Sequence, residues 1–194
     1  MILSLKNITK NFDEKIVLEN FSHDFDDTGI VAITGPSGVG KTTLLRIICG
    51  LDKKYSGEVK TSDRVKFSVA FQEHRLFQNL TALENITEIV YQKSSEENVK
   101  ASVDMLLKLG FTKDEMKLYP SALSGGMKQR VSLARAFLRD ANIIILDEPT
   151  KELDTALVKQ VLDIILDLSK HKLILIVTHN ENDIEYLSAK IIKL

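Results

Sequence analysis

The sequence has few of the features that mark secreted, membrane-spanning or nucleic-acid-binding chains. Cys49 is its one cysteine, so no intramolecular disulfide can form, which suits a reducing compartment. No apolar run approaches the ~20 residues of a membrane span, and the first residues lack the charged lead and apolar block of a signal peptide. The 26 basic and 27 acidic residues leave a net charge of −1, which does not favour a nucleic acid or an anionic membrane surface as partner. We therefore expect a cytoplasmic protein with no direct membrane insertion and no nucleic-acid partner.

The composition, with 44% hydrophobic and 27% charged residues, is that of a globular domain and not of a disordered or fibrous chain. The pattern of apolar residues along the chain predicts an α/β fold. The runs "GIVAITG", "NIIILDEP" and "KLILIVTH" are continuously apolar, as in strands of a parallel sheet that is covered on both faces. "ILSLKNI", "KIVLENFS" and "VKFSVAFQ" predict further strands, the first two in an N-terminal antiparallel β region. "KTTLLRIICG" and "TALVKQVLDIILDLSK" predict flanking helices.

The segment between the two groups of strands has the pattern of a helical insert. "TALENITEIVYQ" opens with a capping box formed by Thr81 and Glu84. "EENVKASVDMLLKLG" and "GGMKQRVSLARAFLRD" predict two more helices, the former with Val99, Val103, Leu106 and Leu107 on one apolar face. We expect one domain, 1–194, in which 1–80 and 140–194 form the core and 81–139 form the helical subdomain.

The stretch "GPSGVGKTT" fits the pattern of a phosphate-binding loop. Its glycines let successive backbone N–H groups point at phosphate oxygens, and the following helix start adds partial positive charge. In this interpretation Lys41 reaches the β- and γ-phosphates and Thr42 holds Mg²⁺. The alternative is a chance match in a glycine-containing turn, which the flanking strand and helix argue against. The predicted phosphate-binding residues are Gly35, Pro36, Ser37, Gly38, Val39, Gly40, Lys41, Thr42 and Thr43.

An acidic pair follows the apolar strand in "NIIILDEP". Asp147 could hold Mg²⁺ through its water shell, and Glu148 is the candidate general base for an attacking water. The alternative is an acid pair that merely leads into a turn at Pro149.

Two more polar residues follow apolar strands, at the sheet edge where Asp147 is expected. Gln72 could ligate Mg²⁺ or its water, and His179 could contact a γ-phosphate and hold the attacking water. A lone histidine at a strand end is more often structural or solvent-exposed, so only the repeated placement singles this one out.

Together with "LSGGMKQ" at 123–129, these motifs closely resemble those of the ATP-binding cassette (ABC) ATPases. The resemblance implies a P-loop NTPase core with an inserted α-helical signature subdomain. It also implies that two cassettes pair head to tail, so that Ser124, Gly125 and Gly126 bind the γ-phosphate of ATP held by the partner chain. Gln129 would reach the ribose of that nucleotide. Ser124 could equally serve as an N-cap, and both roles are compatible.

Other positions carry over from the family one at a time. Phe12 lies where an aromatic stacks on adenine, although a buried aromatic near a strand end is the alternative. Asp154 in "TKELD" matches the aspartate loop that couples the two sites across the dimer. Here the sequence departs from the family, because Lys151 and Glu152 replace the usual pair of small residues.

The segment "EHRLFQNLTALENI" is similar to importer cassettes of the nitrate, sulfonate and taurine type. In those cassettes this region borders a groove that receives a short helix of the membrane subunit. Leu76 and Phe77 would be apolar contacts there, or else core residues of the helical insert. Because the chain stops soon after the strand that follows His179, we expect a compact cassette without a C-terminal ligand-sensing domain.

The resemblance implies a subunit that hydrolyses ATP to power a membrane transporter, more often an importer, at the inner face of the cell membrane. Glu148, His179 and Lys41 would be catalytic, with ATP and Mg²⁺ as cofactors. Its partners would be a second cassette, identical or different, and transmembrane permease subunits. One alternative is a soluble ABC ATPase acting on nucleic acid or the translation machinery; another is a cassette that binds ATP without hydrolysing it.

Overall fold

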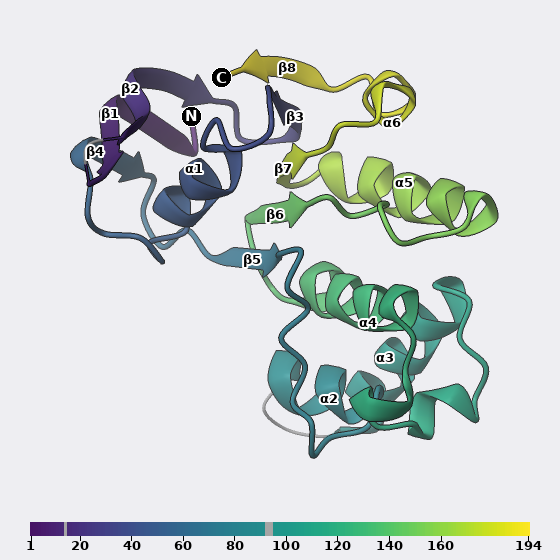
Figure 1. Cartoon of the computed structure of the whole chain (residues 1–194). Coiled ribbons are helices and arrows are strands. Elements are labelled where there is room, and N and C mark those ends of the chain that lie inside the picture. The colour runs from purple at the N-terminus through teal and green to yellow at the C-terminus, as the bar shows by residue number, and fades with distance from the viewer. Residues whose placement is uncertain (14, 92–94) are drawn as a thin grey trace.

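A five-stranded parallel sheet forms the centre of the computed structural model, which describes residues 1–13, 15–91 and 95–194 (Figure 1). Its strand order is β5-β6-β7-β3-β8, and neighbouring strands pair in parallel. The expectation of a parallel sheet is therefore confirmed. The strands are β3 (Gly29–Thr34), β5 (Phe67–Ala70), β6 (Ile143–Asp147), β7 (Leu173–Val177) and β8 (Lys190–Lys193).

A second, antiparallel sheet is built from the N-terminal part of the chain. β1 (Leu3–Phe12) lies in the middle, between β2 (Lys15–Phe25) and β4 (Ser56–Thr61). The apolar pattern predicts the first two strands but not β4, whose residues "SGEVKT" are mostly polar and exposed. This edge strand is held by its backbone pairing with β1 rather than by an apolar pattern.

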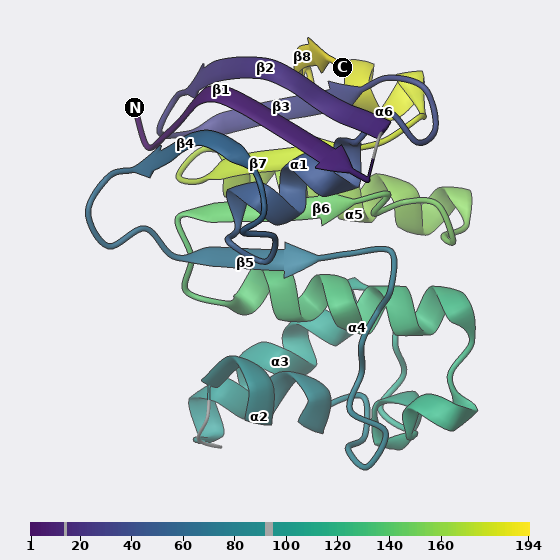
Figure 2. The same ribbon diagram turned by 60° about the vertical axis from the view of Figure 1, so that its left-hand side comes forward.

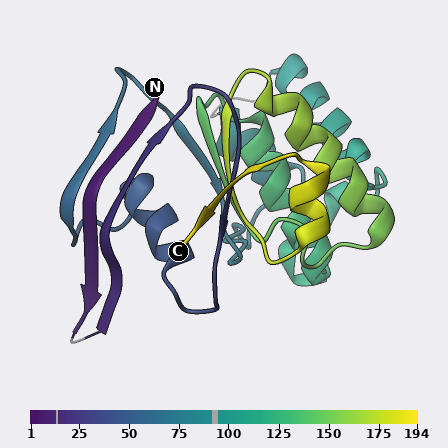
Figure 3. The ribbon, with the colours of Figure 1, turned by 90° about the horizontal axis from the view of Figure 1, so that it is seen from above.

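Helix α1 (Lys41–Ile48) lies between the two sheets (Figures 2 and 3). One hydrophobic core fills this layer and joins α1 to both sheets, with Leu5 from β1, Leu44 and Leu45 from α1, and Ile145 from β6 all almost fully buried. The phosphate loop leads into α1, so this core fixes the start of that helix against the carboxyl edge of the parallel sheet.

The opposite face of the parallel sheet packs against α4 (Gly125–Leu138) and α5 (Thr155–Ser169) (Figure 2). The two-residue period of β6 divides its side chains between the two cores. Ile143 and Ile145 face α1, whereas Ile144 and Leu146 face the helices of the second core. A short helix, α6 (Glu181–Tyr186), leads from β7 to β8.

The helical region predicted between the strands contains α2 (Glu84–Tyr91), α3 (Glu96–Lys108), two short 3₁₀ turns (Glu115–Lys117 and Pro120–Ala122) and α4. The predicted capping box is present: the Glu84 carboxylate accepts from Thr81 N at 2.8 Å, and Thr81 Oγ1 accepts from Glu84 N at 3.3 Å. The predicted core face of α3 is confirmed at Leu106, which is buried, and at Val103, which packs against the core, but it is wrong at Leu107, which is 45% exposed. The buried Ser102 was not predicted.

Across the residues that the structure describes, no helix combines the length and the apolar character needed to cross a membrane.

Burial in the central sheet predicts that replacing two isoleucines by alanine lowers the free energy of unfolding by very different amounts. Ile145→Ala removes a side chain that is 0% exposed, and we expect it to lower the free energy of unfolding by about 2–5 kcal/mol. Ile191→Ala on β8 is the matched control, because Ile191 is 54% exposed, and we expect a change within about 0.5 kcal/mol. Denaturant unfolding measures both values, and equal losses would contradict the assignment of Ile145 to the core.

Candidate active site

The carboxyl ends of four neighbouring strands carry the polar residues predicted for the site. Gln72 follows β5, Asp147 and Glu148 lie at the end of β6, and His179 follows β7. The phosphate loop follows β3, the neighbour of β7 in the sheet. Because all four strands run parallel, these groups meet at one edge although they are far apart in sequence.

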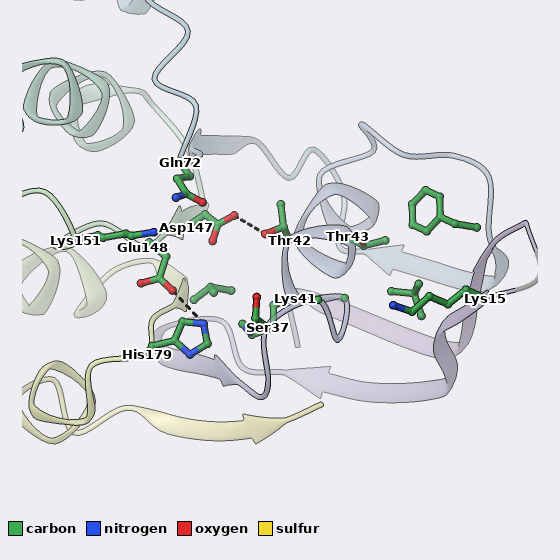
Figure 4. Close-up of a pocket in the computed structure, with 15 residues that line it drawn as sticks. Lys15, Ser37, Lys41, Thr42, Thr43, Gln72, Asp147, Glu148, Lys151 and His179 are labelled. Carbon is green, nitrogen blue, oxygen red and sulfur yellow. Dashed lines mark hydrogen bonds and ion pairs between the residues drawn. The ribbon is translucent and has the colours of Figure 1, made fainter. Parts of the chain in front are cut away.

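A cavity of about 630 Å³ opens at this edge (Figure 4). Gly35, Pro36 and Val39 shape the phosphate loop without lining the cavity. The predicted residues that do line it are Phe12, Ser37, Gly38, Gly40, Lys41, Thr42, Thr43, Gln72, Asp147, Glu148 and His179.

The phosphate loop presents the start of α1 to this cavity. Gly40 is the N-cap residue of α1 and has φ 111°, in the left-handed region that favours glycine. A Cβ atom at Gly40 would lie 2.6 Å from Val17 Cγ1, so the loop also needs glycine for space. Lys41 is 7% exposed, and its ammonium donates to the carbonyl oxygens of Gly35 and Pro36 at 2.8 and 2.9 Å. Free helix N–H groups and a buried ammonium make this loop suited to an anion.

Thr42 and Asp147 connect the phosphate loop to the end of β6. Thr42 Oγ1 donates to Asp147 Oδ2 at 2.7 Å, and Asp147 is 5% exposed (Figure 4). Burial raises the pKa of the Asp147 carboxyl, while the Thr42 hydrogen bond and the charge of Lys41 oppose this shift. The hydroxyl and the carboxylate, together with the amide oxygen of Gln72, form a set of oxygen donors suited to a hard cation such as Mg²⁺.

Glu148 has a backbone conformation that is unusual for its residue type, with φ 53°. Its N–H donates to Val177 O on β7 at 2.8 Å, and its carboxylate lies 3.5 Å from His179 Nε2 (Figure 4). Burial raises the pKa of Glu148, and the charge of His179 opposes this shift. A carboxylate with a raised pKa is a better proton acceptor, which suits a general base.

The end of the cavity near the N-terminal hairpin is formed by Phe12, Lys15 and Val17. Phe12 is 51% exposed, so the alternative of a buried aromatic is wrong. Lys10 Nζ lies 4.7 Å from the centroid of the Phe12 ring and forms an ion pair with Asp52 at 2.8 Å. Lys15 and Val17 were not predicted from the sequence, although Lys15 pairs with Phe12 across the β1–β2 hairpin and Val17 lies two residues further on.

Lys151 also lines the cavity, and its side chain extends toward Gln72 and Asp147 (Figure 4). The sequence marks Lys151 as a departure from the family, but its pattern did not predict this lysine as a residue of the site. A lysine that follows an acidic pair in a turn has no local pattern that shows which way it points.

The signature segment, 123–129, lies outside this cavity. None of the described residues that line the cavity belongs to the segment. Ser124 is the N-cap of α4 and accepts from Met127 N at 3.2 Å, as its alternative role predicted. Asp154 also does not line the cavity and instead caps α5, accepting from Leu157 N at 3.0 Å.

Gln129 differs from its predicted role at a ribose. Its side chain is 6% exposed, with Nε2 donating to Glu148 O at 2.8 Å and Oε1 accepting from Glu152 N at 3.1 Å. Both polar ends of the amide are therefore bonded inside the chain, and this geometry does not support the predicted contact of Gln129 with the ribose of a nucleotide held by another chain. Of the two apolar residues predicted after Gln72, Leu76 is in the core and Phe77 is 50% exposed.

Comparison with known proteins matches residues 18–151 to the family described as "ABC transporter". An aliphatic sulfonates import ATP-binding protein of Bacillus cereus is 37% identical over 206 residues, covering 99% of this chain and 80% of that protein. The L-cystine import ATP-binding protein of Bacillus subtilis (strain 168) is 38% identical over 200 residues, covering 93% of this chain and 81% of that protein.

The fold is also similar to that of a solved structure, the dimeric post-hydrolysis state of the ATP-binding cassette MJ0796 bound to ADP and Pi. The two superimpose with a TM-score of 0.89 at 33% sequence identity, over 100% of this chain and 94% of the other. Because the family match covers most of the chain and both relatives align over nearly all of it, the chain belongs to the ABC transporter family and is an ATP-hydrolysing cassette of that family.

Proposed function

We propose that this chain is the ATPase subunit of an importer of the nitrate, sulfonate and taurine type, and that it works by head-to-tail closure of two cassettes. The observation that carries the proposal is the meeting of the phosphate loop, Asp147, Glu148 and His179 at one cavity. The names of the relatives, which are import ATP-binding proteins, support the direction of transport. Those two relatives are named for the import of different solutes, which is consistent with a solute that is set by subunits other than the cassette.

Binding of ATP starts from the phosphate loop. The N–H groups at the start of α1 and the Lys41 ammonium take the β- and γ-phosphates. Lys41 Nζ already lies 2.8 Å from Gly35 O, within the loop itself, so it reaches the phosphates by a small shift of its side chain. Phe12 lies at the other end of the cavity, where an exposed ring face suits stacking on adenine.

Thr42, Asp147 and Gln72 would hold Mg²⁺ together with the phosphate oxygens of ATP. Among the described residues there is no cluster of three or more His, Cys, Asp or Glu that could hold a metal ion. Mg²⁺ is usually bound through one or two protein groups, water and phosphate. Bound there, the ion would neutralise charge on the phosphates and fix their orientation.

Hydrolysis then needs a base for the attacking water. Glu148 accepts the proton as the water oxygen bonds to the γ-phosphorus, and the bond from that phosphorus to the β–γ bridging oxygen breaks, giving ADP and phosphate. His179 Nε2 lies 3.5 Å from the Glu148 carboxylate, and His179 lines the cavity. In this proposal its ring contacts the γ-phosphate of bound ATP. Burial of Glu148 keeps its pKa raised and so strengthens it as a base.

A second cassette completes the site in this proposal. Ser124, Gly125 and Gly126 stand outside their own cavity at the start of α4, where helix N–H groups favour an anion. They would close over the γ-phosphate held by a partner chain, identical or different. In this arrangement 1–80 and 140–194 act as the ATP-binding core and 81–139 as the signature subdomain.

Permease subunits would hold the cassette at the inner, cytoplasmic face of the cell membrane. Phe77, half-exposed in the segment after Gln72, is the contact that we assign to a short helix of such a subunit. Its neighbour Leu76 is in the core and carries no such role.

The central test uses Glu148→Gln, which removes the base but keeps the shape of the side chain. We expect its ATP turnover to fall by about 10²–10³-fold. We also expect ATP with Mg²⁺ to convert it from monomer to dimer, measured by size exclusion with light scattering, because bound ATP is no longer consumed. Lys41→Ala in the same background is the control and should stay monomeric because it does not bind ATP. Turnover close to wild type in Glu148→Gln would show that another residue is the base.

A second test concerns the adenine end of the cavity. Phe12→Ala should weaken ATP binding by about 5–100-fold, the loss of one base–aromatic stack, and leave the affinity for inorganic tripolyphosphate unchanged. Isothermal titration calorimetry measures both affinities. Ile16→Ala is the control, because Ile16 is 54% exposed on the same hairpin and does not line the cavity. An equal loss for both ligands in Phe12→Ala would mean that Phe12 acts through the loop and not through the base.

A further inference from the structure

One buried side chain joins the signature helix to the loop that carries Glu148. Gln129 lies in the second turn of α4, shortly after the signature glycines. Its amide N–H donates to Glu148 O at 2.8 Å, and its amide oxygen accepts from Glu152 N at 3.1 Å. The side chain is 6% exposed, so both of its polar ends are used by backbone groups of a single loop, 148–152.

The start of α4 and this loop are also in close steric contact. A Cβ atom at Gly125 would lie 2.5 Å from Glu152 Oε2, and one at Gly126 would lie 2.6 Å from Glu152 O. A side chain at Gly126 is therefore excluded by the loop backbone, whereas one at Gly125 would only need the flexible Glu152 side chain to move. The first turns of α4 therefore meet this loop at two points, the close backbone approach at Gly126 and the two hydrogen bonds of Gln129.

The contact with α4 includes one of the hydrogen bonds that hold the Glu148 backbone. A residue other than glycine at φ 53° is strained, and such strain persists only where the surroundings hold it. Lys151 N, from the same loop, donates to Glu148 O at 3.3 Å. Two shorter hydrogen bonds, both 2.8 Å, come from outside the loop, one on each side of the Glu148 Cα: Glu148 N donates to Val177 O, and Glu148 O accepts from Gln129. The first anchor belongs to the central sheet and the second to the signature helix.

We propose that Gln129 is a positioning residue that holds the Glu148 backbone, and therefore its carboxylate, in place for the attack of water. This inference rests on the role proposed above for Glu148. Gln129 also links two proposed sites. It belongs to α4, whose start is proposed to bind the partner's nucleotide, and its amide bonds the backbone of Glu148, the proposed base of the chain's own site. If α4 moves when two cassettes close, the Gln129 hydrogen bond would transmit that movement to the backbone of Glu148 in the same chain.

Two substitutions separate the hydrogen bond to Glu148 from simple packing. Gln129→Met keeps the length of the side chain but leaves Glu152 N without its partner, and it leaves Glu148 O with only the longer bond from Lys151 N at 3.3 Å. Gln129→Glu keeps an acceptor for Glu152 N and removes the donor to Glu148 O. Gln160→Met is the matched control, because it makes the same chemical change at an exposed position on α5.

The experiment compares kcat for ATP with the Kd for a non-hydrolysable ATP analogue in the full chain, with thermal unfolding to confirm that each variant is folded. We expect kcat to fall by about tenfold or more in both Gln129 variants, because a small misplacement of a reacting group costs that much or more. The Kd should stay within about twofold, since Gln129 does not line the cavity. Gln160→Met should match wild type in both quantities.

A loss of kcat by less than about fivefold in either folded variant, or a parallel loss of kcat and affinity, overturns the positioning role. If Gln129→Met does not fold, Gln129→Glu decides the question alone. If the wild-type chain itself shows no ATP turnover, the proposed function fails, whereas an active wild type matched by both variants overturns only the role of Gln129.

Discussion

Parallel pairing of β5, β6, β7 and β3 is the constraint on which the site depends. It sets Gln72, Asp147, Glu148, His179 and the phosphate loop at one edge, although they span more than half of the chain. The pairing is held by strands whose residues are buried on both faces, as in β6 and β7. The same burial that stabilises the sheet removes water from the acids at its edge, so packing and chemistry have a common cause.

That burial has an energetic consequence for the two acids. The pKa values of Asp147 and Glu148 are both raised, chiefly by burial, so the folded state binds protons more tightly than the unfolded chain does. Stability therefore falls as pH rises from their ordinary pKa values through the raised ones, and at neutral pH both acids cost stability. The hydrogen bond from Thr42 and the nearby Lys41 offset part of this cost at Asp147. The strained backbone of Glu148 and the partly desolvated acids both cost folding free energy. The rest of the fold offsets this cost, chiefly through the two hydrophobic cores on either side of the sheet.

Local patterns in the sequence predict the parts of this structure that local physics decides. Continuous apolar runs predict the parallel strands, and the Thr81–Glu84 spacing predicts a cap that is present. β4 could not be found in this way, because a polar edge strand is held by backbone pairing alone. Gln129 was misplaced for a similar reason: its partners are the backbone atoms Glu148 O and Glu152 N, which leave no mark in a side-chain pattern. Such contacts are decided by how segments that are distant in sequence pack together, and that packing cannot be deduced from local patterns in a single sequence.

The two charged residues that replace the family's small pair lie on opposite sides of one loop. Lys151 faces the chain's own cavity, where its charge acts to lower the pKa values of Asp147 and Glu148. Glu152 faces the signature helix, with its carboxylate against Gly125 and 3.6 Å from His74 Nε2. A carboxylate is favourable at a helix N-terminus because of the helix dipole, so Glu152 stabilises the start of α4 in the single chain. If two chains pair head to tail as proposed, a phosphate of the partner's ATP would approach the same helix start. The two anions would repel each other there unless the carboxylate moved or were neutralised. The departure at Lys151 and Glu152 therefore adds charge to both faces of the loop that Gln129 ties to the signature helix.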